Sequence, residues 1–301
     1  MVLIVEYRKT KNENEQSLCI IDGGNFSASC SKKDVETPQA GNDVIKIVTN
    51  VAPLTRVPDL KEDGSGNFVK DDVLSIFVAG TMNTISTTYT LGATSMSWSG
   101  LKLPGGVSEV TFSACYPKQE LSNDGTFEFN TSTAEYKDLL LSEAQKVTVG
   151  SPNPVNLSFN HAMHLLNISF SSDGYYSAEE LKTLVTTCKA KAACVVDAAS
   201  GKIKSTKPEV ASFVKEGTTA SFYLVPQPTA DVTLSVKINQ LTKEYSLKTL
   251  LEELKMPQET LLGGKKITLT LKLCKDKITV EGGAIGSWGD QATVDGEVVI
   301  D

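Results

Sequence analysis

The residue with the most sharply defined chemistry in this sequence is Arg56. The chain has two arginines, Arg8 and Arg56, so 29 basic residues minus these two leaves 27 lysines, and Arg56 is the only arginine after Cys30. Pro53 and Pro58 lie close on either side of it and favour an extended backbone. An exposed, extended segment is what a protease needs in order to cut a chain. The pattern therefore predicts a cleavage site at Arg56, with an ordinary surface arginine as the alternative.

Cys30 is a candidate site of lipid attachment. Small residues precede it in the stretch 27–29, and a polar stretch with the composition of a linker follows it at 37–42. This arrangement is typical of the end of a bacterial lipoprotein signal. Lipid on Cys30 would hold the chain on a membrane, and cleavage after Arg56 would release the rest of the chain from that anchor.

The residues before Cys30 do not fit such a signal. A secretion signal needs an apolar centre, whereas residues 9–22 are polar and charged. Suitable codons for residues 12–26, read one base later, would encode a basic start followed by an apolar centre. We therefore interpret residues 1–29 as a leader that has been read in the wrong frame or from the wrong start.

Groups suited to catalysis are few. The two histidines, His161 and His164, are expected to be hydrogen-bonded structural residues, with a metal-binding or general-base role as the less favoured alternative. The stretch Gly263-Gly264-Lys265-Lys266 lacks the first glycine and the hydroxyl residue of a phosphate-binding loop. The sequence contains no nucleophile elbow, and its carboxylates are scattered. We expect no enzyme activity, no cofactor and no metal site.

Cysteines and tryptophans are expected to be structural. None of the six cysteines has C-x-x-C spacing. Cys188 and Cys194 are close enough in sequence to pair, but buried free thiols are the favoured interpretation. Trp98 and Trp288 could stack on sugars, although positions in a core or at a seam between domains are favoured.

Composition limits the class of protein. With 40% apolar and 22% charged residues, the chain has the balance of a globular protein. A net charge of −7 argues against nucleic acid as a partner. No uncharged apolar run approaches the ~20 residues that span a bilayer, so we expect a soluble or lipid-tethered protein. Its 301 residues leave room for two domains.

Strand-like segments dominate the hydrophobic pattern. Short β-branched runs separated by turns about every 8–12 residues predict an all-β fold of sandwich type, with short helices. The strands are expected at 43–51, 73–78, 86–91, 110–116, 127–129, 146–149, 155–159, 165–170, 194–196, 220–225, 232–238, 266–273, 278–280 and 293–300. Helices are expected at 181–188, after a capping box that starts at Ser177, and at 247–256. Glycines at 282–289 are expected to loosen the segment between the last two strands.

A turn-rich stretch at 150–154 suggests a domain boundary. The expected division is a leader at 1–29, a tether and removable strand at 30–56, an N-terminal sandwich at 57–154, a C-terminal sandwich at 155–274, and a tail of extended strands at 275–301. The tail could pack on its own domain or add to the sheet of a neighbour.

Several motifs occur together in an order that resembles a known family. They are His161-Ala162-Met163, Leu224-Val225-Pro226-Gln227-Pro228, Gly264 to Leu271, Ile278-Thr279-Val280 and Ile285-Gly286-Ser287-Trp288. With the lipobox-like Cys30 and the Thr55-Arg56 site, this order resembles the fimbrillin family, the pilus-forming surface lipoproteins of anaerobic Gram-negative bacteria. The resemblance covers roughly residues 30–301.

The resemblance implies two β-sandwich domains of transthyretin-like, Greek-key type. It implies lipidation at Cys30, attachment to the outer membrane at the cell surface, and cleavage of the Arg56–Val57 bond by an Arg-specific protease. The cleaved-off strand would be 43–51, with Val44, Ile45, Ile47 and Val51 as its apolar residues. Other pilus subunits would be the partners, and the tail 277–301 would supply the donor strand. The apolar residues of that donor are Ile278, Val280, Val294, Val298 and Ile300.

Loss of an interior strand leaves unpaired backbone groups and bare apolar side chains. Refilling the gap with about five apolar residues is worth roughly 8–15 kcal/mol before the cost of ordering the donor. The expected function is therefore that of a pilus subunit assembled by strand exchange. The alternative is a non-polymerising surface lipoprotein that binds a host glycan or protein.

Overall fold

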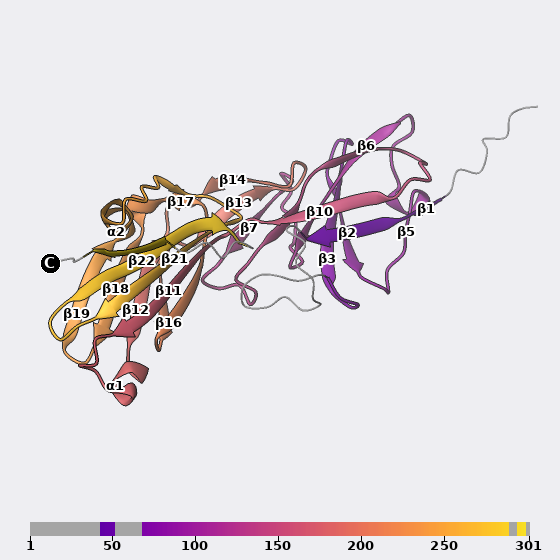
Figure 1. The fold of residues 1–301 in the computed structure, drawn as a ribbon. Coiled ribbons are helices and arrows are strands. Elements are labelled where there is room, and N and C mark those ends of the chain that lie inside the picture. The colour runs from indigo at the N-terminus through magenta and orange to yellow at the C-terminus, as the bar shows by residue number, and fades with distance from the viewer. Residues whose placement is uncertain (1–42, 52–67, 289–293, 299–301) are drawn as a thin grey trace, which may run out of the picture. The chain divides into compact units, whose positions relative to one another are not determined.

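Strands form almost all of the regular structure in this computed structural model, which describes residues 43–51, 68–288 and 294–298, the last range as backbone only. The fold is all-β and of sandwich type, as the sequence predicts. Figure 1 shows the arrangement of the strands and the two short α-helices. Within the described residues, neither helix is long and apolar enough to cross a membrane.

A seven-stranded sheet contains most strands of the first half of the chain, in the order β2-β10-β8-β6-β3-β4, with β9 also paired to β6. Its strands are β2 (Ile47–Val51), β3 (Val73–Ala79), β4 (Ile85–Thr90), β6 (Glu109–Tyr116), β8 (Leu140–Ser142), β9 (Gln145–Thr148) and β10 (Val155–His161). In β10, buried Val155, Leu157 and Phe159 alternate with exposed polar residues. This alternation places one face of the sheet against a core.

A short pair of strands closes the end of this core. β1 (Val44–Ile45) pairs with β5 (Met96–Ser97), and the 3-10 helix η1 (Ser99–Leu101) follows β5. Trp98, between β5 and η1, is buried and meets Phe112 edge-on at 6.0 Å between ring centroids. The core position predicted for Trp98 is therefore confirmed.

The second half of the chain forms two facing sheets. The five-stranded sheet, ordered β16-β11-β21-β22-β23, contains β11 (His164–Ser172), β16 (Thr219–Leu224), β21 (Lys265–Leu273), β22 (Ile278–Ser287) and β23 (Val294–Val298). The four-stranded sheet, ordered β15-β12-β18-β19, contains β12 (Val185–Lys191), β15 (Val210–Glu216), β18 (Thr233–Ile238) and β19 (Leu241–Ser246). Alternate residues of both sheets, such as Leu166 and Leu234, share one hydrophobic cluster.

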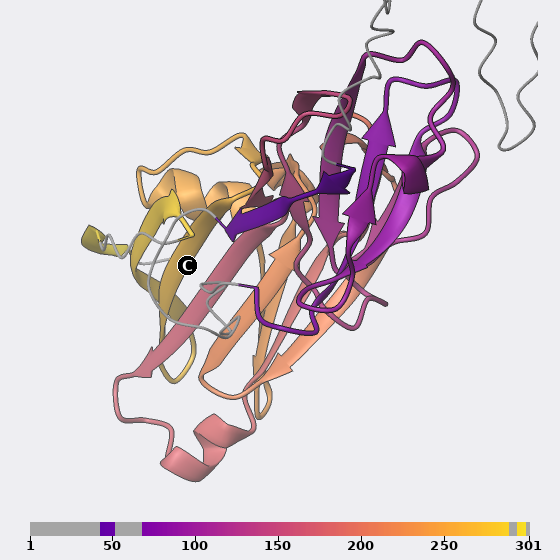
Figure 2. The same cartoon turned by 90° about the vertical axis from the view of Figure 1, so that its right-hand side faces the viewer.

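The helices cover the edges and connections of this sandwich. α1 (Ala178–Lys182) starts with the predicted capping box, in which Ser177 and Glu180 bond each other's backbone N–H groups. In Figure 2, α1 lies in the loop beyond the far end of β11. α2 (Leu247–Glu253) buries three leucines against the core, Leu247, Leu250 and Leu251.

Two small sheets complete the fold. One orders β14 (Lys202–Thr206), β13 (Ala193–Asp197) and β7 (Thr126–Asn130), and the other pairs β17 (Gln227–Pro228) with β20 (Thr260–Leu261), close to the 3-10 helix η2 (Thr229–Asp231). Pairing of β7 with β13 joins segments from the two halves of the chain. The third hydrophobic cluster likewise takes residues from both halves, including Phe129 and Trp288. The division into two sandwiches at 150–154 stays a prediction.

Two sequence-based predictions of local structure are wrong. The helix predicted at 181–188 ends at Lys182, and β12 begins at Val185. The β-branched run at 185–187 is paired on both sides, by β15 and β18, and this pairing outweighs the helical pattern. The segment predicted to be loose at 282–289 is instead part of β22, which continues to Ser287. A Cβ on Gly283 would lie 3.0 Å from Leu254 Cδ1, so this glycine allows close packing.

Candidate strand-exchange site

The segment predicted to be removable is built into the fold as an edge strand. β2 runs parallel to β10, with Ile47 opposite Val155 and Val51 opposite Phe159. Within the described part of the chain, β2 is the terminal strand of its sheet and pairs with β10 alone. Figure 1 shows β2 alongside β10, with β1 beyond it. The expectation of an interior strand is therefore corrected, because only one side of β2 carries a ladder.

The four predicted apolar residues of this segment differ in burial. Ile45 is 5% exposed and Val51 is 2% exposed, and both belong to the hydrophobic cluster that contains Val155, Leu157 and Phe159. Ile47 is half-buried against the same cluster, whereas Val44 is exposed. Two side chains are thus fully buried, where about five were expected to refill the site.

Polar contacts hold the start of this segment. The Asp43 carboxylate accepts hydrogen bonds from the Ser99 backbone N–H, at 2.9 Å, and from the Ser99 hydroxyl, at 2.7 Å. The Asp43 carbonyl accepts a bond from Trp98 N at 2.8 Å. The bonds from Ser99 lower the pKa of Asp43 below its usual value. The segment is therefore attached at both ends of its length, by Asp43 at one end and Val51 at the other.

Four predicted site residues lie outside the described residues. They are Cys30 for lipidation, Arg56 and Val57 for cleavage, and Ile300 for the donor strand. Their predicted roles in lipidation, cleavage and donation stay predictions. Val51, at the end of β2, is the described residue that comes last before Arg56 in the chain.

The predicted donor residues fall into two groups. Ile278 and Val280 lie in β22, which pairs with β21 on one side and β23 on the other, and both are buried in the chain's own core. Their removal would open that core, so their burial counts against a role in donation. Val294 and Val298 are the first and last residues of β23, an edge strand among the described residues, and they pair opposite Gly283 and Val280.

His161 and Trp288 join the end of β10 to the end of β22. Their rings stack with centroids 3.9 Å apart and an interplanar angle of 13°. His161 Nδ1 lies 2.6 Å from Asp138 Oδ2, and Trp288 Nε1 donates to the Lys265 carbonyl at 3.0 Å. Burial raises the pKa of Asp138, against the opposing effect of its bond with His161. The structural roles predicted for His161 and Trp288 are confirmed.

His164 is buried, and its burial makes the folded chain less stable at acid pH. Its Nδ1 lies 2.9 Å from the Leu262 carbonyl, which can only accept, so Nδ1–H donates. Burial lowers its pKa from 6.5 to about 4. Between about pH 6.5 and pH 4 the His164 side chain is therefore protonated in the unfolded chain but neutral in the folded chain. The free energy of unfolding falls as the pH falls through this window.

We expect the contribution of His164 to lower the free energy of unfolding by about 2 kcal/mol between pH 7 and pH 5. His164→Gln keeps a donor for the Leu262 carbonyl but cannot titrate, so its stability should change less over the same range. Urea unfolding of both proteins at each pH measures the difference. Equal losses in the two proteins would contradict this assignment.

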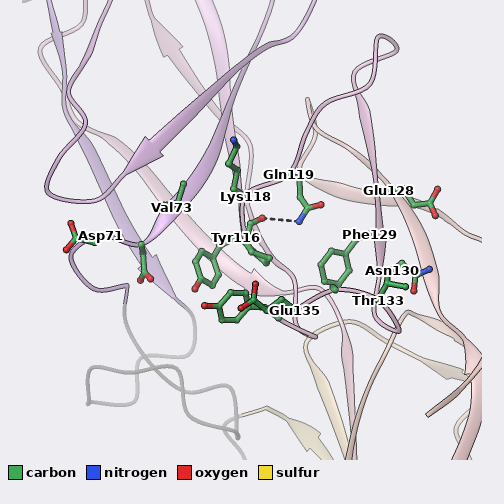
Figure 3. Close-up of a pocket in the computed structure, with 14 residues that line it drawn as sticks. Asp71, Val73, Tyr116, Lys118, Gln119, Glu128, Phe129, Asn130, Thr133 and Glu135 are labelled. Carbon is green, nitrogen blue, oxygen red and sulfur yellow. Dashed lines mark hydrogen bonds between the residues drawn. The ribbon is translucent and has the colours of Figure 1, made fainter. Parts of the chain in front are cut away.

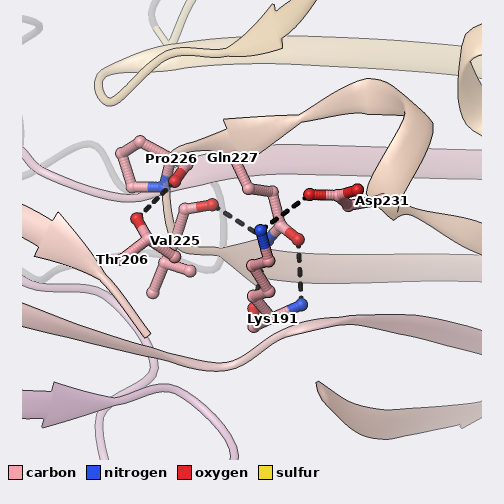
Figure 4. A network of polar contacts seen from close by, with 6 residues as sticks. All are labelled: Lys191, Thr206, Val225, Pro226, Gln227 and Asp231. Carbon is pink, nitrogen blue, oxygen red and sulfur yellow. Dashed lines mark hydrogen bonds and ion pairs between the residues drawn. The ribbon is translucent and has the colours of Figure 1, made fainter. Parts of the chain in front are cut away.

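A buried glutamine fixes the connection after β16. Gln227 accepts a bond from Lys191 N at 2.8 Å and donates to the carbonyls of Lys191 and Val225, each at 3.0 Å. Lys191 Nζ pairs with Asp231 at 2.7 Å, and the Thr206 hydroxyl donates to the Pro226 carbonyl. Figure 4 shows this network. The Gln227 side chain thus pairs both the backbone N–H and the backbone carbonyl of Lys191.

The described cysteines are free. Cys115, Cys188 and Cys194 are buried, and Cys274 is partly buried. Burial raises the pKa of Cys188 and of Cys194 to about 12. These two residues lie in different sheets, on β12 and β13, in agreement with the interpretation as buried free thiols. No group of three or more metal-ligating side chains occurs among the described residues.

Comparison with known proteins shows which protein family the sequence matches. The sequence profile of the fimbrillin-like family matches residues 55–288, which is most of the chain. No curated protein matches the chain.

Several solved structures from Bacteroides have a similar fold. A candidate cell adhesion protein from Bacteroides uniformis has a TM-score of 0.61 at 16% identity, over 82% of this chain and 100% of that chain. One from Bacteroides ovatus has a TM-score of 0.54 at 17% identity, over 83% of this chain and 99% of that chain. A candidate adhesin from Bacteroides thetaiotaomicron has a TM-score of 0.50 at 9% identity, over 83% and 97%. At these identities the similarity establishes the fold.

Proposed function

Since the chain belongs to the fimbrillin-like family, we propose that it is a structural subunit of a pilus at the cell surface. In this proposal the chain is exported as a lipoprotein through Cys30 and anchored in the outer membrane. An Arg-specific protease then cleaves the Arg56–Val57 bond, and the trimmed subunits polymerise by strand exchange. No part of this function requires a cofactor.

The observation that carries the proposal is the position of β1 and β2. They precede Arg56 in the chain, and they bury Ile45 and Val51 in the core of a sheet that is otherwise made from residues after Arg56. Cleavage would therefore separate one edge strand from the sheet that it completes. Its departure would expose the backbone edge of β10 and the apolar side chains of the core that Ile45 and Val51 cover.

The donor in this proposal is the end of the chain. β23 is an edge strand among the described residues and pairs with β22 alone. Its transfer to the vacated edge of a second subunit would leave β22 and its buried Ile278 and Val280 in place. A contact between the tail of one subunit and the sheet of the next does not close on itself, so it produces a filament.

Arg-specific proteolysis tests this proposal. The full-length protein, treated with such a protease, should lose residues 1–56 and form oligomer ladders that resist mild denaturant. Arg56→Ala should be cut only after Arg8, so that residues 9–301 stay in one piece and remain monomeric. Arg8→Ala is the matched control, because it removes the only other arginine and should assemble like the original chain.

Two results would contradict the proposal. Filaments of Arg56→Ala would show that cleavage at this position is not needed. A trimmed protein that stays monomeric at high concentration would favour the alternative function, a non-polymerising surface adhesin for a host glycan or protein.

A further inference from the structure

An open groove lies between the start of β3, the end of β6, and β7 with the loop that follows it. Its volume is about 680 Å³, within the ~300–1,000 Å³ that is usual for small-molecule sites. Its lining comes from residues 71–73, 116–119, 128–130 and 133–136. We call it the 116–136 groove. Figure 3 shows Asp71 on one side, Asn130 and Glu128 on the other, and Tyr116 and Glu135 between them.

Tyr136 provides an aromatic surface in this groove. Its side chain is 51% exposed, although it belongs to a mostly buried group of rings. Tyr116 supports it from behind, with centroids 5.8 Å apart, and Phe68 in turn contacts Tyr116 at 5.4 Å. Burial, with Asp72 and Tyr136 adding to it, raises the pKa of Tyr116 to about 12. The buried Tyr116 ring therefore stays neutral, and Tyr136 presents the exposed part of its own ring to the groove.

The groove also offers both hydrogen-bond acceptors and donors. Among the described residues, neither the Asp71 nor the Glu135 carboxylate takes part in a hydrogen bond or an ion pair, and both line the groove. The Asn130 side-chain oxygen accepts from the backbone N–H and hydroxyl of Ser132, which leaves the amide NH2 as a donor. Lys118 adds an ammonium group, although it also pairs with Glu120.

This mixture of groups defines the class of ligand. The ammonium groups of a lysine-rich peptide would satisfy the carboxylates, but they cannot accept bonds from the Asn130 amide or from Lys118, so only the backbone carbonyls of the peptide could do so. An acidic ligand would meet four carboxylates, from Asp71, Asp72, Glu128 and Glu135, against one lining lysine. Sugar hydroxyls both donate and accept, and a sugar ring presents an apolar face that packs on an aromatic side chain. We propose that the 116–136 groove binds neutral sugar units, with Tyr136 as the stacking surface.

This proposal goes beyond the role of a pilus subunit and does not depend on polymerisation. It also moves the sugar-stacking role away from the tryptophans considered from the sequence. Trp98 and Trp288 are both buried, whereas Tyr136 is half exposed beside polar groups that have free hydrogen-bonding capacity.

Saturation-transfer NMR and titration calorimetry of the full chain test the proposal. The probes are cellotetraose, maltotetraose and chitotetraose, with sialyllactose and tetralysine as charged comparisons. We expect at least one neutral tetrasaccharide to bind. Tyr136→Ala should weaken that binding by about tenfold or more, because it removes the stacking surface. Glu135→Gln, which keeps the side-chain shape, should weaken it as well.

Tyr175→Ala is the matched control, because Tyr175 is 56% exposed and lies outside the groove. It should bind like the original chain. The proposal is overturned if no neutral tetrasaccharide binds, if only tetralysine or sialyllactose binds, or if Tyr136→Ala and Tyr175→Ala bind equally well. Circular dichroism of each variant confirms that the fold is retained.

Discussion

A chain that begins at Val57 is expected to be less stable than one that keeps β1 and β2, and to associate with itself. The truncation removes two fully buried side chains, Ile45 and Val51. At about 1.5–3 kcal/mol for each fully buried aliphatic side chain, their loss lowers the free energy of unfolding by about 3–6 kcal/mol. The same cut bares the backbone of β10 along its pairing with β2, from Val155 to Phe159. Unpaired edges of this kind recruit another strand.

A chain that begins at Asp43 is the matched control for this experiment. It lacks the leader, Cys30 and the tether, but it keeps the hydrogen bonds of Asp43 to Ser99 and the whole of β2. Urea unfolding at low concentration compares the stability of the two chains, and size-exclusion chromatography over a concentration series compares their association. Equal stability and equal mass in the two chains would contradict the proposed role of β1 and β2.

Residues 43–51 stabilise the fold less than the sequence suggested, because β2 lies at the edge of its sheet. Alternation at 43–51 correctly predicts a strand, but alternation does not say whether a strand lies inside a sheet or at its edge. The parallel pairing with β10 is a long-range contact that begins at Ile47, and the exposed Val44 lies in β1, which pairs with β5 in a separate sheet. The edge strand β2 buries Val51, and β1, in its own two-stranded sheet, buries Ile45, so the whole segment buries two side chains.

Strands with one apolar face could be predicted from the sequence, and strands with little apolar character could not. β18 and β21 have a clear alternation of buried and partly exposed residues, and both were expected. β14 and β15 were missed, because each has mostly exposed or half-buried positions and several polar residues. Their positions are set by pairing with β13 and β12, which no local pattern records.

The candidate sites likewise include residues that the local sequence indicates and residues that only the fold brings together. Arg56 stands out by its residue type and Cys30 by the residues around it, and both remain predictions because they lie outside the described residues. The 116–136 groove gave no signal in the sequence, because Asp71 and Tyr136 are far apart in the chain. The burial of Ile278 and Val280 in their own sandwich was likewise not predictable, because a free tail strand and an integrated one have the same alternation.

Trp288→Ala is expected to lower the free energy of unfolding by about 3–5 kcal/mol, the usual cost of truncating a buried aromatic residue. The indole is 4% exposed and belongs to the hydrophobic cluster that takes residues from both halves of the chain. Besides stacking on His161, it lies 5.6 Å from the Tyr223 ring, between centroids. Its loss also leaves the Lys265 carbonyl without its indole partner. Urea unfolding, followed by far-ultraviolet circular dichroism, measures the change.

Phenylalanine variants separate the packing of Trp288 from its hydrogen bond. Trp288→Phe keeps a ring over His161 but loses the donor to the Lys265 carbonyl, so it should cost about 1–3 kcal/mol for an unmade bond, in addition to the change in volume. Trp98→Phe is the matched control, because Trp98 Nε1 is buried without a hydrogen-bond partner among the described residues. Its replacement removes an unsatisfied donor, so it should cost less than Trp288→Phe. If the two phenylalanine variants lose equal stability, the bond from Trp288 to the Lys265 carbonyl does not strengthen the pairing of the end of β22 with the start of β21 in the way that the geometry indicates.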